Sequence, residues 1–125
     1  MGVVTGMVRP SQGVARRPVE RATDAWVQVL VGPAEGAANF VLRKFTLEPG
    51  GVIPLHRHPH VEHEQYVLSG RIRLTLGGSV QEVTAGDAVF IPAGVPHRYD
   101  NPGPETAEFL CVVPQTASYE TEWLD

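Results

Sequence analysis

The chain has a single cysteine, Cys111, so it cannot form an internal disulfide. One free thiol fits a reducing compartment. No apolar run approaches the roughly 20 residues that a membrane-spanning helix needs. The start of the chain also lacks the charged region and long apolar run of a secretory signal. These absences predict a cytoplasmic protein that has no contact with a membrane and whose core holds without covalent cross-links.

Positive charge is also scarce. Lys and Arg number 10 against 14 Asp and Glu, which gives a formal net charge of -4. The basic residues are scattered along the chain, so the sequence lacks the basic patch that is typical of nucleic-acid-binding proteins. We therefore expect a small-molecule partner and no nucleic acid.

The sequence shows no helical period of any length. Instead, 13 glycines and 11 prolines divide the 125 residues into short apolar or alternating segments, which are typical of strands joined by tight turns. The expected strands are residues 26–31, 40–47, 52–58, 65–68, 71–76, 80–83, 88–91, 97–99 and 108–113. A turn is expected at residues 48–51, because Pro49 cannot donate a ladder hydrogen bond. This spacing predicts an all-β fold, an antiparallel sandwich or barrel.

A chain of this length is expected to form one domain, residues 1–125. Residues 1–25, which are rich in Gly, Pro and Arg near their start, are interpreted as an N-terminal arm and first edge segment. Residues 115–125 form a polar tail, in which Tyr119 and Trp123 are candidate anchors.

Four of the five histidines lie close together: His56, His58, His60 and His63. The fifth, His97, lies far downstream. Side chains alternate between the two faces of a strand, so His56 and His58 should share a face. A third imidazole from the loop that follows and a fourth from another strand can converge on the same metal ion. We interpret the histidine pattern in this way.

The segment of residues 51–70 resembles the first motif of the cupin family. A glycine pair at residues 50–51 leads to His56-x-His58. Four residues separate this pair from His63, and six more separate His63 from Gly70.

A second segment resembles the second cupin motif at every position. Gly86 is followed after five residues by Pro92-x-Gly94, after two more by His97, and after three more by Asn101. The paired match implies a double-stranded β-helix, the cupin jelly-roll barrel, with its core at residues 38–114.

One position departs from the usual motif. His63 stands where most cupins have a glutamate ligand, and Glu62 and Glu64 flank it. The sequence therefore resembles the small bacterial cupins with a four-histidine site. That likeness implies a homodimer with one divalent transition metal ion per chain, Mn or Fe in preference to Ni, Cu or Zn. The implied ligands are His56, His58, His63 and His97.

Two alternatives concern neighbouring residues. A shift of the loop register by one residue would let Glu62 or Glu64 replace His63 as a ligand. His60 fits no motif position and is expected to be exposed, or to support a ligand from behind.

Four further residues are candidates for the substrate pocket: Arg43, Tyr99, Phe109 and Cys111. Tyr99 should share a face with His97, where it is either a phenolic donor or a core aromatic. Alternation places Phe109 and Cys111 on one strand face, which the resemblance points into the barrel. Arg43 is either a cation that faces the cavity or a surface residue.

Four neutral ligands leave the charge of a dication uncompensated, so the site should attract an anion such as an enolate or a carboxylate. Three functions are consistent with such a site. The first is a metal-dependent oxidoreductase, dioxygenase-like, acting on a small organic substrate. The others are a non-enzymatic binding or sensor module, and an isomerase or lyase that uses the metal as an electrophile. The oxidoreductase is favoured, although fold does not choose between them and no residue is assigned as a catalytic base.

The ligand set can be tested with two histidine variants. His58→Ala should abolish tight metal binding, whereas His60→Ala should leave it nearly intact. Elemental analysis of each purified variant checks this, and equal losses would show that the ligand set is wrong. Because ligation needs neutral imidazoles, metal should also leave as the pH falls through about 6.

Overall fold

The structure, a computed structural model, describes residues 5–125. Ten strands and two short 3-10 helices, η1 (Ser11–Gly13) and η2 (Pro33–Glu35), make up the elements of these residues. The strands are β1 (Arg17–Pro18), β2 (Thr23–Val31), β3 (Phe40–Arg57), β4 (His63–Ser69), β5 (Arg71–Leu76), β6 (Ser79–Thr84), β7 (Ala88–Ile91), β8 (His97–Asp100), β9 (Ala107–Pro114) and β10 (Glu122–Trp123). In this part of the chain no helix has the length and apolar character needed to span a membrane.

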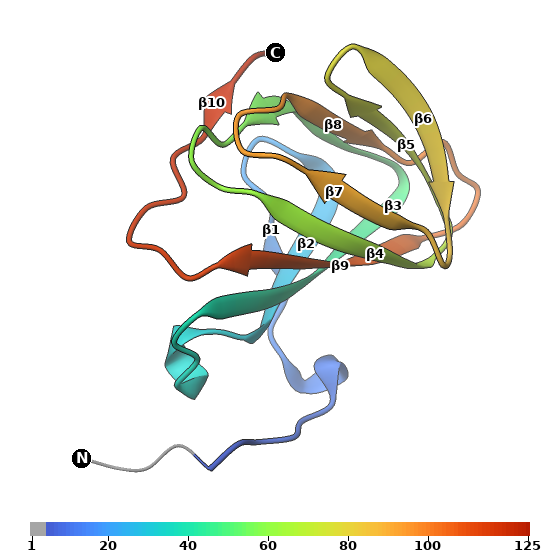
Figure 1. The fold of residues 1–125 in the computed structure, drawn as a ribbon. Coiled ribbons are helices and arrows are strands. Elements are labelled where there is room, and N and C mark those ends of the chain that lie inside the picture. Colours follow the sequence, from blue (N-terminus) through green and yellow to red (C-terminus); the bar gives the residue numbers. More distant parts are fainter. Residues whose placement is uncertain (1–4) are drawn as a thin grey trace.

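The strands form one antiparallel sheet. Its main path runs in the order β6-β5-β8-β3-β9-β4-β7, while β2 and β10 also pair with β3, and β1 pairs with β2. Figure 1 shows the sheet curling so that β5, β6 and β8 face β4, β7 and β9. This curled antiparallel sheet confirms the predicted all-β double-stranded β-helix.

Alternating side chains fill the interior of the curl. Along β9 every second residue is buried, and β4 and β5 show the same period of two. The largest of the fully buried side chains include Phe109, Leu47, Ile72 and Ile91. Burial of each such side chain contributes about 1.5–3 kcal/mol, so this apolar interior is the main support of the barrel.

Strand β3 corrects one expectation. The sequence predicted two strands separated by a turn at residues 48–51, but the strand continues through them, with Gly50 at a positive φ of +83°. Residues 40–47 pair with β9, and from Val52 onward the strand pairs with β8. Where the partner changes, the Gly50 amide donates to the Asn101 carbonyl (3.0 Å) and the Asn101 amide donates to the Gly51 carbonyl (2.9 Å). The Pro-Gly-Gly segment therefore bends the strand without reversing it.

Asn101, the last residue of the second motif, fixes this bend. Its buried side-chain amide donates to the carbonyl oxygens of Leu47 and Glu105, both at 2.9 Å. Its side-chain oxygen accepts a hydrogen bond from the Gly103 amide at 2.8 Å. A buried amide with these partners ties β3 to the loop after β8, so the residue has a structural role.

Short strands near each end of the described chain, β1 and β10, pair with strands of the sheet. The first four residues of the predicted arm lie outside the described residues, but β1 pairs with β2. In the tail, Trp123 pairs opposite His56, and the Tyr119 hydroxyl donates to the Pro114 carbonyl at 2.7 Å. The Asp125 carboxylate accepts hydrogen bonds from the Leu55 amide (2.9 Å) and from an Arg98 side chain (2.7 Å). The tail is therefore held against the end of β3. The limits of the domain, residues 1–125, remain a prediction.

Two motif glycines offer a matched test of close packing. Gly70 and Gly86 have φ values of +77° and +94°, so alanine is strained at either position. A Cβ on Gly70 would also lie 2.6 Å from the Ala107 Cα and from the Thr106 oxygen, whereas a Cβ on Gly86 would meet nothing within 4 Å. Gly86→Ala should cost about 1–2 kcal/mol of unfolding free energy. Gly70→Ala should cost about 1–3 kcal/mol more, since β9 must move. Urea denaturation measures both, and equal losses would contradict this account.

Candidate metal centre

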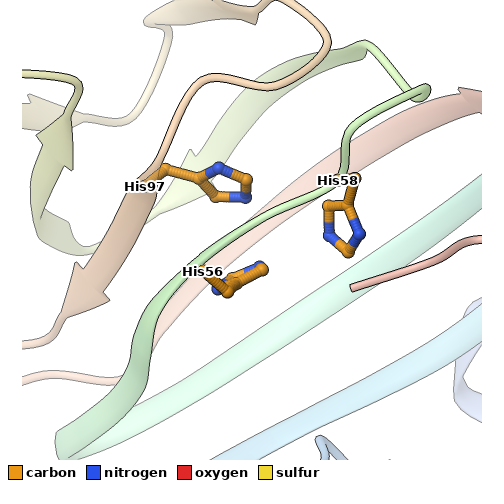
Figure 2. Close-up of side chains that lie close together, drawn as sticks. All are labelled: His56, His58 and His97. Atoms are coloured by element: carbon orange, nitrogen blue, oxygen red, sulfur yellow. The ribbon is translucent and has the colours of Figure 1, made fainter. Parts of the chain in front are cut away.

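Histidines from separate parts of the chain meet at one end of the barrel. His56 is the penultimate residue of β3 and pairs opposite His97, the first residue of β8. His58 follows the end of β3. Figure 2 shows the three rings converging on a common space. One nitrogen of each lies within 4.8 Å of the other two, so these side chains form a candidate metal site.

His63, at the start of β4, lies beside this group of three. Its ring centroid is 4.9 Å from that of His58 and 5.5 Å from that of His97. His63 is only 4% exposed, whereas Glu62, just before β4, and Glu64, the second residue of β4, are exposed. The register therefore turns His63 inward and leaves both carboxylates in solvent.

Backbone and tail groups orient three of the rings. The Nδ1 atoms of His56 and His97 lie 2.7 Å and 3.0 Å from the carbonyl oxygen two residues earlier in the chain. His58 Nδ1 lies 3.2 Å from the Glu120 carbonyl and 3.1 Å from the Thr121 hydroxyl. A carbonyl only accepts, so Nδ1 carries the proton and Nε2 keeps its lone pair. This arrangement presents an imidazole to a metal ion.

Burial keeps the imidazoles neutral. Burial is the largest cause, and the nearby His56 is the second, of a pKa lowered to about 4 for His58 and to about 3 for His97. Burial, followed by the Arg43 guanidinium, lowers the pKa of His63 to about 2. Burial also lowers the pKa of His56. At neutral pH all of these rings are in the form that binds a metal.

The donor set fits a divalent transition metal ion. Imidazole nitrogens bind zinc at about 2.1 Å, so two nitrogens on one such ion lie at most about 4.2 Å apart. The 4.8 Å spread of the three-ring cluster needs only a small adjustment to reach this limit. The fourth ring, His63, has a buried Nδ1 that finds no hydrogen-bond partner among residues 5–125, so none of these residues fixes its tautomer. Imidazole donors suit Mn, Fe, Ni, Cu and Zn.

The four rings line a cavity of about 420 Å³. Its walls are mixed: apolar side chains such as Phe45, Ile53 and Trp123 alternate with polar and charged ones. A volume of this size lies within the usual range for small-molecule sites.

Three of the four predicted pocket residues, Arg43, Tyr99 and Cys111, line this cavity. Phe109 does not, which corrects the expectation. Its side chain is 2% exposed and its ring stacks on Phe45 and Tyr99, with centroids 5.1 Å and 5.0 Å away. Alternation gave Phe109 the correct face, but these neighbouring rings cover it, so it supports the wall from behind.

Gln65 is a buried cavity residue that the sequence did not single out. Its side-chain amide donates to the Tyr99 hydroxyl at 2.6 Å and to Cys111 Sγ at 3.5 Å. Burial raises the pKa of Tyr99, so its hydroxyl keeps the proton. Because the Tyr99 oxygen accepts from Gln65, its own proton remains free to donate. The spacing of two residues from His63 was the signal that could have identified Gln65.

Trp123 has a larger role than the anchor that the sequence predicted. It lines the cavity, and its ring centroid lies 5.0 Å from that of His56. Thr121 also lines the cavity and holds His58. His60 is exposed and lies outside the cluster of three.

Fold and site together define a small β-barrel protein with an imidazole cluster inside one end. Residues 43–113 match the family described as Cupin domain, and the chain belongs to the cupin family. The structure is similar to that of the polyketide cyclase RemF from Streptomyces resistomycificus, with a TM-score of 0.86 and 32% identity. That likeness covers 97% of this chain and 88% of RemF.

Two curated relatives match this chain over less than half of their own length. The xanthan biosynthesis protein XanB of Xanthomonas campestris pv. campestris is 31% identical over 109 residues, which are 87% of this chain and 22% of XanB. The 1-methylthio-D-xylulose 5-phosphate methylsulfurylase of Rhodospirillum rubrum is 39% identical over 72 residues, 58% of this chain and 46% of that protein. The chain thus spans less than half of either relative.

The lowered histidine pKa values predict how the stability of the metal-free protein depends on pH. An unfolded chain takes up protons on histidine near pH 6.5, whereas His58 and His97 have folded pKa values of about 4 and about 3. Between these limits the unfolded state binds more protons, so the free energy of unfolding should fall as the pH falls. The slope is at most about 1.4 kcal/mol per pH unit for each histidine.

Thermal melts of metal-free protein between about pH 7 and about pH 5 test this, above the range in which most carboxylates titrate. His60→Ala, at an exposed ring, should keep the slope, while His63→Ala should reduce it. A melting temperature that does not change in this window would contradict the prediction. Proton competition at His58 should accordingly begin near pH 4, below the value of about 6 expected from free histidine.

Proposed function

We propose that the protein is a metal-dependent enzyme that acts on a small organic substrate. One divalent transition metal ion per chain, Mn or Fe in preference to Ni, Cu or Zn, would be held by His56, His58, His63 and His97. The observation that carries the proposal is the convergence of buried, neutral imidazoles on a cavity of about 420 Å³. A homodimer is part of the proposal and rests on the resemblance to four-histidine cupins.

The metal would supply Lewis-acid chemistry at a carbonyl or enol oxygen, and redox chemistry as well in the case of Mn or Fe. The chain supplies orientation and surroundings. Hydrogen bonds at Nδ1 hold the rings of His56 and His97 in the ligating tautomer. Tyr99 offers a hydroxyl proton to a substrate oxygen, with Gln65 holding its oxygen in place. The apolar side chains Phe45, Ile53 and Trp123 would border the apolar part of the substrate.

The class of reaction is the finer part of the proposal. The sequence favoured a dioxygenase-like oxidoreductase. The likeness to RemF, described as a polyketide cyclase and 32% identical over almost the whole chain, supports a non-redox reaction instead. We therefore place first a cyclase, isomerase or lyase reaction in which the metal acts only as an electrophile, and second the oxidoreductase. A binding module without catalysis is the remaining alternative.

Elemental analysis of the native protein, combined with turnover assays, separates these functions. We expect about one metal ion per chain, and conversion of a β-diketone substrate that proceeds without oxygen. The same assay with an oxygen electrode, using diketones, hydroxy acids and thiols, tests the oxidoreductase.

Each outcome assigns a different function. Metal-dependent oxygen uptake would replace the first proposal by the second. A bound metal without turnover would favour the binding module. Native protein without metal, and unchanged by added Mn, Fe or Zn, would overturn all three.

A further inference from the structure

The cavity contains a cation that the histidine cluster does not use. Arg43, on β3 opposite Cys111 of β9, lines the cavity. One of its terminal nitrogens donates to Cys111 Sγ at 3.3 Å, and its guanidinium lies over the Phe45 ring, 5.0 Å from the centroid. Its Nε is buried and has no hydrogen-bond partner. A thiol and an aromatic ring are therefore the only partners found for this guanidinium within residues 5–125.

No carboxylate in the described part of the chain forms an ion pair with this guanidinium. Within residues 5–125, the arginines other than Arg43 that form no ion pair are Arg17, Arg21 and Arg73. Those three residues are exposed, and Arg17 also lines the cavity, whereas Arg43 is half-buried. Glu20 also lines the cavity but forms no ion pair with Arg43. A charge that has lost water without gaining an anion is costly. That cost is recovered if the anion comes from a ligand.

We propose that Arg43 anchors an oxyanion of the substrate, a carboxylate or an enolate carried on a largely apolar ring compound. A guanidinium matches a planar oxyanion with two parallel hydrogen bonds. The apolar walls at Phe45, Ile53 and Trp123 suit a ring better than a small hydrated ion. The inference rests on the proposed function in that it names the substrate class of the same cavity, but the anchoring itself needs no metal.

Salicylate, an aromatic carboxylate with an adjacent hydroxyl, is the probe, and salicylamide is its neutral counterpart. Calorimetric titrations use metal-free protein, so that chelation does not contribute. Wild-type protein should bind salicylate at least 10-fold more tightly than salicylamide, and Arg43→Gln should weaken salicylate binding about 10- to 100-fold. Arg43→Lys keeps the charge and loses the planar group, so its affinity for salicylate should lie between those of wild type and Arg43→Gln. Arg73→Gln, at an exposed arginine away from the cavity, is the matched control and should bind as wild type.

The inference is wrong if wild-type protein fails to bind salicylate, or if it binds salicylamide equally well. Both measurements use wild-type protein, so neither depends on whether a variant folds. Folded Arg43→Gln with wild-type affinity would also overturn it. Inorganic phosphate that binds as tightly as salicylate would overturn the apolar ring as the ligand class.

His58→Ala separates this inference from the proposed metal chemistry. That variant should lose metal yet keep Arg43-dependent salicylate binding, whereas Arg43→Gln should keep its metal, measured by elemental analysis. If the metal proposal alone fails, native protein will lack metal while salicylate binding still depends on Arg43. If this inference alone fails, metal will bind while the affinity for salicylate will not depend on Arg43.

Discussion

The change of partner along β3 is the constraint on which the site depends. One continuous strand pairs with β9 over its first half and with β8 over its second. It therefore carries Arg43 into one wall of the cavity and His56 into another, opposite His97. The exchange needs glycine at the bend and backbone hydrogen bonds to Asn101. Motif residues distant from the cavity thus set where the imidazoles lie.

Neutral charge and fixed orientation of the rings come from the same packing. Burial removes the water that would stabilise an imidazolium, and backbone carbonyl oxygens accept hydrogen bonds from the Nδ1–H groups of His56 and His97. A cluster of bases inside a barrel is costly unless a cation completes it. The half-buried Arg43 is costly for the opposite reason, because it lacks an anion. The cavity therefore contains imidazoles that can bind a cation and a guanidinium that can bind an anion. A metal ion with an anionic ligand would supply both.

The sequence predicted most of the strands and the inward histidines, because motif spacing and alternation are local properties. Predictions were wrong where distant partners decide. Residues 48–51 resemble a turn, but hydrogen bonds to Asn101 keep them in the strand. Phe109 has the predicted face, yet Phe45 and Tyr99 cover it. The position of Trp123 depends on a strand of two residues, too short to show any period.

The tail hydrogen bonds to His58 couple two parts of the chain that the sequence does not connect. The Glu120 carbonyl and the Thr121 hydroxyl contact the same ring nitrogen, so docking of the tail and the tautomer of His58 are linked equilibria. Such linkage is reciprocal. If the docked tail raises the affinity of the His58 ring for a cation by some factor, a bound cation favours the docked tail by the same factor. Thr121 and Trp123 of the same tail line the cavity, so the segment that orients His58 also forms part of the cavity wall.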